Sequence, residues 1–337
     1  MSIRNNMPEL SKLEQQALNA LLLREAKYSK QIQQQLAKSL TSIYGEMKKI
    51  YDKYAINGKL TRAEMTKYNK YSTMEKVITD QLDPAIKANI KTIKHLLPSQ
   101  FNESFFHYAW AIDNATGVRL SWGLVNTKVL LGAFDITNPK NIELVEALKN
   151  YGPTAKKRIR AALLNGLSVG KSYDQMARDL KKSMRKIYSS AITIVRTEGQ
   201  TAINAGQDYT YLQARDKGIN GNIVWSTAKD SRVRPEIKLT KKGKVINTKN
   251  MANHRIMDGA TKNKDGLFYL PTTNEYARFP GDPNLSAEQR CNERCTERFE
   301  IDGYSPQLMR TREEGVIPYQ NYMDYAKEYH PDWLKNA

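Results

Sequence analysis

Cysteine, histidine and long apolar runs are scarce in this chain of 337 residues, which has two Cys and four His. Two cysteines cannot form the framework of a disulfide-rich scaffold. No apolar run reaches the length of about 18 residues that a membrane span requires. The first residues lack the basic, apolar and small-residue succession of a signal peptide. We therefore expect neither a membrane-spanning nor a classically secreted protein.

Acidic side chains are outnumbered, by 35 Asp and Glu to 53 Lys and Arg, which gives a formal net charge of +18. Residues 151–250 alone carry 21 basic and 7 acidic side chains. A field of this sign favours polyanionic partners, nucleic acid first and an anionic membrane surface second. The alternative is that the basic surface only keeps the protein soluble.

Proline and glycine are rare in the first part of the chain, because Glu9 to Ile56 contains no Pro and only Gly45. Apolar residues recur there at steps of three and four, which predicts a long helix. Asn57-Gly58 marks its end, and the capping-box pattern Thr61-x-x-Glu64 starts another helix. We expect that helix to run to about Gln81 and to break at Asp83-Pro84. A third helix should cover about Ala85–Leu97 and end before Pro98.

Farther along, we expect helices over residues 142–150, 155–165, 172–182 and 187–215, with a loop at 166–170. Gly206 weakens the expected continuity of the last of these helices. After Gly218 the pattern changes, and short strands are expected at 222–227, 245–246 and 267–270. Tyrosines at helical spacing in the tail predict a further short helix.

The predicted fold class is α+β: a helical N-terminal half with long helices, followed by a compact, loop-rich C-terminal module with short strands. We divide the chain into a helical region (1–100), an aromatic connector (101–152), a basic helical region (153–218), the C-terminal module (219–303) and a tail (304–337).

The two cysteines, Cys291 and Cys295, are separated by three residues, and His254 precedes them. Two thiolates and an imidazole can bind Zn²⁺, with Asp258 as a fourth ligand. A disulfide is a second interpretation, and a pair of packed thiols is a third, which we favour narrowly. No cofactor is expected apart from this zinc ion.

A catalytic interpretation would start from His254 together with Asp230, Asp258 and Asp282, as in a metal-dependent nuclease. The alternative is that the carboxylates cap loops and that the histidine is a buried hydrogen-bonding group. The module contains no second histidine, so we do not expect an enzyme.

Two clusters of cations lie on neighbouring predicted helices and are candidate DNA-binding residues. Such faces bind phosphate by counterion release, without reading base sequence. A merely solvated basic face is the alternative. The candidates are Lys156, Lys157, Arg158, Arg160, Lys181, Lys182, Arg185 and Lys186.

A series of short motifs follows in a characteristic order, from Gly166–Leu180 through Val195-Arg-Thr-Glu198 with Asn204 to Val224–Pro235, His254–Gly259, Phe279–Pro283 and the closing cysteines. This order resembles the Mu F-like minor head proteins of tailed bacteriophages, also called phage head morphogenesis proteins. Two features depart from the family pattern. Glu236 stands where a histidine commonly follows the Arg-Pro element, and the cysteines are three residues apart instead of one.

The resemblance implies a structural virion component, made in the bacterial cytoplasm and placed inside the head near the portal. It implies roles in head assembly and in DNA packaging or ejection. The expected partners are the portal protein, for which residues 1–100 would provide the docking surface, packaged double-stranded DNA, and the scaffold or major capsid protein. The resemblance assigns no catalytic residue. A metal-dependent nuclease and a generic DNA-binding protein are the alternatives.

Overall fold

The structure is a computed structural model. It describes residues 10–67, 71–123, 142–230, 232–235, 238–239, 245–246, 252–302, 308–311, 315–318, 320, 322–329 and 331. The first nine residues, the middle of the expected connector (124–141) and most of the Lys-rich stretch at 236–251 lie outside these ranges.

The chain forms two compact units. The helical unit comprises Glu25–Leu96 and Ile142–Val195. The mixed unit comprises Met1–Arg24, Leu97–Asn141 and Arg196–Ala337. Each unit thus combines separate stretches of the chain, whereas the five regions expected from the sequence are consecutive.

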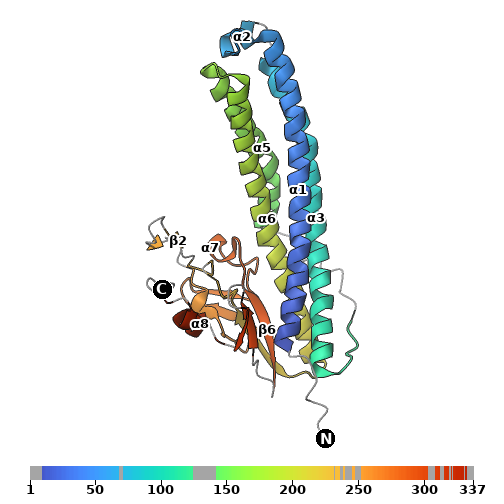
Figure 1. The fold of residues 1–337 in the computed structure, drawn as a ribbon. Helices are drawn as coiled ribbons and strands as arrows, with labels where there is room; N and C mark the ends of the chain where they lie inside the picture. The colour runs from blue at the N-terminus through green and yellow to red at the C-terminus, as the bar shows by residue number, and fades with distance from the viewer. Residues whose placement is uncertain are drawn as a thin grey trace. The chain divides into compact units, whose positions relative to one another are not determined.

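The helices are long. They are α1 (Leu10–Tyr54), α2 (Arg62–Lys67), α3 (Tyr71–Thr116), α5 (Ile142–Ser168) and α6 (Tyr173–Asp216), labelled in Figure 1. The predicted end of the first helix is confirmed, since Asn57 and Gly58 take positive φ values of 50° and 71°. The capping box is also confirmed. The Glu64 N–H donates to Thr61 Oγ1 at 3.2 Å, and the Thr61 N–H donates to Glu64 Oε2 at 2.8 Å.

The expected breaks at Pro84 and Pro98 are wrong, because α3 continues through both prolines. A proline within a helix costs about 3 kcal/mol. Full burial of one large apolar side chain contributes about 1.5–3 kcal/mol. Leu82 and Ile86 are buried beside Pro84, and Leu97 and Phe101 are buried beside Pro98. Tertiary packing on both sides of each proline therefore outweighs the local penalty.

The other expected helix breaks are also wrong. Helix α5 is continuous through Pro153 and includes residues 166–168, which we expected in a loop. Helix α6 replaces two expected helices and contains Gly206. A Cβ at Gly206 would lie 2.5 Å from the Phe101 carbonyl oxygen of α3. Glycine is therefore needed because the two helix backbones cross closely in the mixed unit.

Outside its helical segments, the described part of the mixed unit contains four two-stranded antiparallel sheets. In the first, β1 (Gly221–Ser226) pairs with β6 (Thr296–Ile301), with Ile223 opposite Phe299. The other pairs are β2 (Lys238–Leu239) with β3 (Val245–Ile246), β4 (Phe268–Leu270) with β5 (Glu275–Ala277), and β7 (Leu308–Thr311) with β8 (Gly315–Pro318). The short helices are η3 (Arg255–Met257), α7 (Ala287–Arg290) and α8 (Tyr322–Tyr329). The α+β class, the three expected strands and the tail helix are confirmed.

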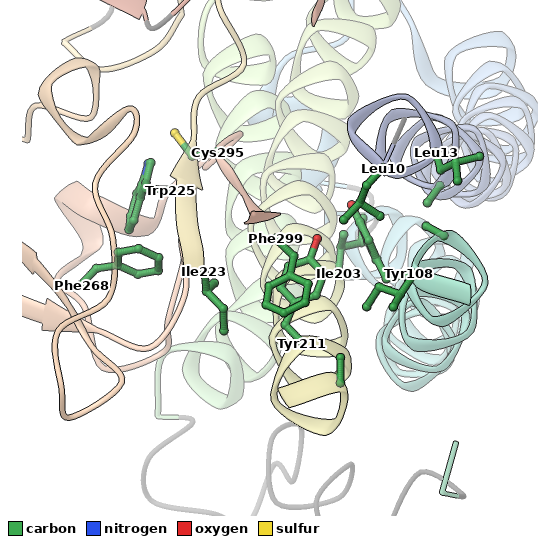
Figure 2. Close-up of a cluster of buried hydrophobic side chains, with 14 of the residues drawn as sticks. Leu10, Leu13, Tyr108, Ile203, Tyr211, Ile223, Trp225, Phe268, Cys295 and Phe299 are labelled. Carbon is green, nitrogen blue, oxygen red and sulfur yellow. The ribbon is translucent and has the colours of Figure 1, made fainter. Parts of the chain in front are cut away.

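The core of the mixed unit joins helices to the β1–β6 sheet (Figure 2). Tyr211 of α6 stacks on Phe299 of β6, with ring centroids 5.2 Å apart. Leu10 and Tyr108, from α1 and α3, belong to the same buried cluster as Trp225 of β1. This core fixes the segments of α1, α3 and α6 that lie beside the candidate site.

Candidate functional site

One face of α6 is polar although it is buried. Its members recur at steps of three and four residues, which places them on one side of the helix. They include the threonine and the glutamate of the Arg-Thr-Glu motif and the asparagine that follows it. The buried members are Thr197, Glu198, Thr201, Asn204 and Gln207. We call this set the polar face of α6.

Two residues of the polar face satisfy the outer edge of β6. Gln207 Nε2 donates to the Glu297 carbonyl at 2.6 Å, and the Glu297 N–H donates back to Gln207 Oε1 at 3.1 Å. Asn204 Nδ2 donates to the Cys295 carbonyl at 2.9 Å. The Phe299 N–H donates to Glu14 Oε1 at 3.1 Å. Side chains thus take the place of a neighbouring strand, which leaves these edge groups paired.

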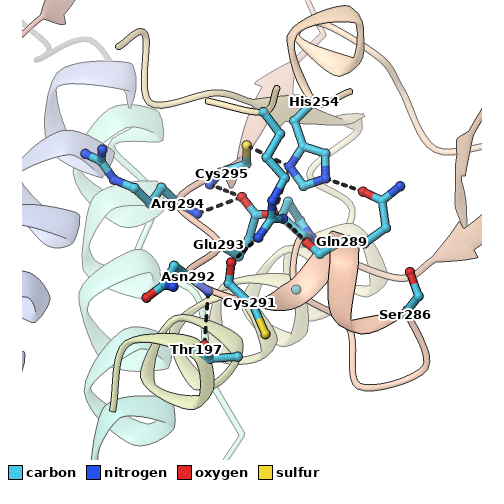
Figure 3. A network of polar contacts seen from close by, with 12 residues as sticks. Thr197, His254, Ser286, Gln289, Cys291, Asn292, Glu293, Arg294 and Cys295 are labelled. Atoms are coloured by element: carbon cyan, nitrogen blue, oxygen red, sulfur yellow. Dashed lines mark hydrogen bonds and ion pairs between the residues drawn. The ribbon is translucent and has the colours of Figure 1, made fainter. Parts of the chain in front are cut away.

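The rest of the polar face holds the loops that carry the later motifs. Arg290 donates two hydrogen bonds to the Glu198 carboxylate, at 2.9 and 3.0 Å, and both side chains are buried. Thr201 Oγ1 donates to the Gly281 carbonyl at 2.8 Å. The Asn292 N–H donates to Thr197 Oγ1 at 3.0 Å (Figure 3). The Arg-Thr-Glu motif is therefore a docking element for the module.

His254 is the centre of a second buried network (Figure 3). Its Nδ1 lies 2.8 Å from Glu293 Oε2, and its Nε2 contacts Gln289 Oε1. Gln289 Nε2 donates to Thr273 Oγ1 at 2.7 Å, and the Thr273 hydroxyl donates to Glu275 at 3.2 Å. This chain of donors fixes the Gln289 amide with its oxygen toward His254. Oxygen atoms of Glu293 and Gln289 therefore face both ring nitrogens of His254.

Glu293 is the anion of this network. Burial acts to raise the pKa of its carboxyl, but His254, the Arg234 guanidinium and the Cys295 backbone N–H outweigh burial and lower that pKa to about 2. Arg234 Nη1 lies 3.2 Å from Glu293 Oε2. The network thus places His254 and the Arg234 guanidinium around one buried carboxylate and ties the segment at 252–257 to the segment at 289–295.

Cys295 lies beside His254, with Sγ 3.6 Å from Nδ1. Burial and the neighbouring Glu293 carboxylate raise the pKa of the Cys295 thiol well above its usual value. A nucleophilic cysteine needs a thiolate and access to substrate. His254, Glu293 and Cys295 are all at least 95% buried. The trio is therefore unsuited to nucleophilic catalysis.

The structure brings together two of the three predicted zinc ligands. His254, Glu293 and Cys295 present ligand atoms within 4.8 Å of one another. Cys291 is exposed and its thiol is free, and its sulfur points away from His254 in Figure 3. Zinc binding would require a thiolate and a ring nitrogen without its proton, next to the Arg234 guanidinium. The described cluster thus contains His254 and Cys295 but not Cys291, and zinc at these residues stays an untested prediction.

The three aspartates of the catalytic interpretation stabilise separate loops. Asp258 accepts from the Thr227 N–H at 2.8 Å. Asp282 accepts from the Arg278 and Asn284 N–H groups, at 2.9 and 3.0 Å. Asp230 accepts from the N–H of Arg232 at 3.0 Å. These contacts are those of loop-capping carboxylates.

The motifs of the sequence meet in the structure, because the polar face of α6 bonds to the loops that carry the later motifs. Comparison with known proteins identifies the same segment of the chain. Residues 157–297 match the family described as "Phage Mu protein F like protein". The chain contains a Mu F-like region. The polar face of α6 and the loops that it holds belong to this region, apart from the contact of Glu14.

Two curated proteins are similar to the chain. Minor head protein GP7 of Bacillus phage SPP1 is 29% identical over 310 residues, which cover 89% of this chain and 92% of that protein. The NAD(+)–arginine ADP-ribosyltransferase EFV of Enterococcus faecalis is 22% identical over 240 residues, 70% of this chain but 45% of that enzyme. No solved structure is significantly similar to the chain.

The eight predicted DNA-binding residues lie in the helical unit, the first four on α5 and the others on α6. Seven are exposed and Arg158 is half-buried. Lys156 directly precedes the Mu F-like region, the other seven lie within it, and none belongs to the polar face of α6.

Sequence reasoning did not identify Glu14, Gln207, Arg234, Gln289 or Glu293 as site residues. Glu14 had a signal, since it interrupts the apolar stripe of the first helix. Gln207 follows Asn204 by three residues and so continues the polar face of the Mu F-like region. Arg234 and Glu293 lie in loops and Gln289 lies in the four-residue helix α7, and in segments this short no periodicity distinguishes a buried position from an exposed one.

Proposed function

We propose that the protein is a structural minor head protein of a tailed bacteriophage, placed inside the head near the portal. It acts in head assembly and in DNA packaging or ejection, and it contacts DNA without reading its sequence. The observation that carries this proposal is the match to a phage minor head protein along nearly the full length of both chains.

A structural role also agrees with the chemistry of the Mu F-like region. Its buried polar residues make hydrogen bonds and ion pairs between segments of the chain, as Glu198 does with Arg290. The ADP-ribosyltransferase match covers less than half of that enzyme, so its activity gives no residue roles here. We therefore propose a protein without catalytic activity.

The charge distribution supports the DNA contact. The central hundred residues carry most of the net charge of +18, and their clustered cations are exposed. Phosphate binding by such cations is independent of sequence and weakens steeply with salt. None of the described helices is apolar over enough of its length to cross a bilayer.

Particle composition tests the structural role. Mass spectrometry of purified virions should detect this protein in intact heads, and removing its gene should lower the yield of infectious particles. Comparison with emptied particles then shows whether the protein leaves with the DNA. Absence of the protein from purified virions would contradict the proposal and favour a generic DNA-binding protein.

Docking to the portal protein is tested with point variants, because Leu10 and Leu13 belong to the core of the mixed unit and deleting residues 1–100 would remove them. Leu23 and Ile56 are apolar but 74% and 57% exposed. We expect Leu23→Asp or Ile56→Asp to weaken co-purification with portal protein. Val169→Asp, at a position 69% exposed but outside residues 1–100, is the matched control. Equal binding by all variants would show that neither Leu23 nor Ile56 belongs to the docking surface.

A further inference from the structure

Three of the four candidate DNA-binding residues on α5 contact neighbouring helices within the helical unit. Lys156 Nζ lies 2.7 Å from Asp83 Oδ1, and Arg160 Nε lies 3.1 Å from Glu75 Oε1, both on α3. Each such ion pair contributes only about 0–1 kcal/mol of stability. Each nevertheless places a carboxylate beside the cation, so the local charge that a phosphate would meet is close to zero.

Arg158, on the other side of α5, contacts α6. Its Nη1 donates to Ser190 Oγ at 2.9 Å and to the Lys186 carbonyl at 3.4 Å. Lys156 and Arg160 therefore join α5 to α3, and Arg158 joins α5 to α6. These side chains flank the buried stripe of α5, which includes Ala155 and Ile159.

The cations of α6 have a different placement. Leu180, Met184, Ile187 and Ala191 form the buried side of this helix. At about 100° of rotation per residue, Lys182, Arg185 and Lys186 lie within an arc of about 100° on the opposite side. Lys181 lies at the edge of this arc, and all four are exposed. We call these four residues the basic stripe of α6.

No carboxylate in the adjoining sequence offsets the basic stripe, because residues 181–195 contain no Asp or Glu. The nearest preceding acid, Asp179, has Lys171 Nζ at 2.6 Å. The stripe therefore combines high positive charge, exposure and a direction away from the buried side of its helix. A surface needs these properties to bind DNA phosphates and to release the counterions condensed around them.

We infer that the phosphate-binding surface is the basic stripe of α6, and that Lys156, Arg158 and Arg160 of α5 act as bundle contacts. This inference rests on the DNA contact of the proposed function and divides seven of its eight candidate residues into two roles. Lys157 is exposed and lines a pocket between α3 and α5 together with Glu75 and Arg160, so it is assigned to neither role.

Two triple variants of the full chain test this division, because each removes three positive charges from the same unit. One carries Lys182→Gln, Arg185→Gln and Lys186→Gln. The other carries Lys156→Gln, Arg158→Gln and Arg160→Gln. Binding to two DNA duplexes of unrelated sequence is measured as a function of salt concentration, and folding is checked by circular dichroism and thermal unfolding.

We expect the α6 variant to bind both duplexes weakly and to lose about 2.7 from the slope of log K against log salt, at about 0.9 for each cation removed. The α5 variant should keep most of the slope and should unfold at a lower temperature. Equal loss of slope in both variants, or a larger loss in the α5 variant, would overturn the inference. Absence of salt-dependent binding by the unaltered protein would instead refute the DNA contact of the proposed function.

Discussion

Glu14 should make the stability of the mixed unit depend on pH. It lies on α1 and is 7% exposed. Its Oε1 accepts hydrogen bonds from the Phe299 N–H and from the Tyr211 hydroxyl. The charged groups that act on it are Arg298 and Glu300 of β6, and Tyr108 of α3 is a further buried titratable neighbour. A carboxyl in this position is held by neutral donors in an apolar core.

Burial raises the pKa of Glu14 from its ordinary 4.5 to about 7, against the lowering effects of Tyr211, Phe299 and Arg298. Since the folded-state pKa lies above the unfolded value, the folded protein binds this proton more tightly. The stability from Glu14 is fully present below about pH 4.5 and is lost as the pH rises to about 7. Each pKa unit corresponds to about 1.4 kcal/mol, so the loss amounts to about 3 kcal/mol.

The substitution Glu14→Gln isolates this effect. Glutamine keeps an Oε1 that can accept from both donors, but it cannot ionise. We expect the variant and the unaltered protein to have similar free energies of unfolding near pH 4.5. Above pH 7 the variant should be more stable by up to about 3 kcal/mol. Urea denaturation at a series of pH values between these limits measures the difference directly.

Other buried carboxyls also titrate, so the comparison between matched proteins is essential. The pKa values of Asp208 and Glu297 are raised mainly by burial, and both side chains contact Lys262. Their contributions cancel in the difference between the two proteins. Glu46→Gln, on α1 but in the helical unit, should leave the pH profile unchanged. If Glu14→Gln had the same pH profile as the unaltered protein, the reasoning about burial at this site would be wrong.

Three further predictions concern the core and the thiols. Gly206→Ala should destabilise the protein by about 1–3 kcal/mol because its Cβ would meet a backbone oxygen. Gly45→Ala, with open space around it, should stabilise the protein by about 0.5–1 kcal/mol. Thermal unfolding measures both changes, and equal shifts in the two variants would contradict the close helix crossing at Gly206. Arg290→Met should cost about 3–5 kcal/mol, since it removes the buried guanidinium that donates two hydrogen bonds to the Glu198 carboxylate, and a loss below 1 kcal/mol in urea denaturation would count against that pairing. Purified protein should release two titratable thiols on denaturation, with only Cys291 reactive when folded, while stoichiometric zinc would contradict the interpretation as packed thiols.

Local sequence patterns were sufficient for those features that depend on neighbours within a few residues. The end of α1 at Asn57-Gly58 and the capping box at Thr61–Glu64 are formed by short-range hydrogen bonds. The β1 strand follows from an apolar run between turn residues. The motif order also predicted the Mu F-like region, because it preserves residue types at fixed spacing.

Continuity of the helices was decided by tertiary packing. Pro84 and Gly206 are local signals for a break, yet both lie within long helices. Apolar side chains buried around Pro84 outweigh the missing hydrogen bond, and Gly206 serves the close approach of α3. Neither compensation can be seen within a window of a few residues.

The candidate site shows the same division. The sequence by itself determined the residue types that could do chemistry, His254 and Cys295 among them, and the excess of cations in the central hundred residues. Only the tertiary structure placed Glu293 beside His254, turned the Glu198 motif toward Arg290 and distinguished bundle contacts from an outward stripe. The physical reason is distance along the chain: helical periodicity acts over three or four residues, whereas Glu198 and Arg290 are 92 residues apart and meet only when the core has packed.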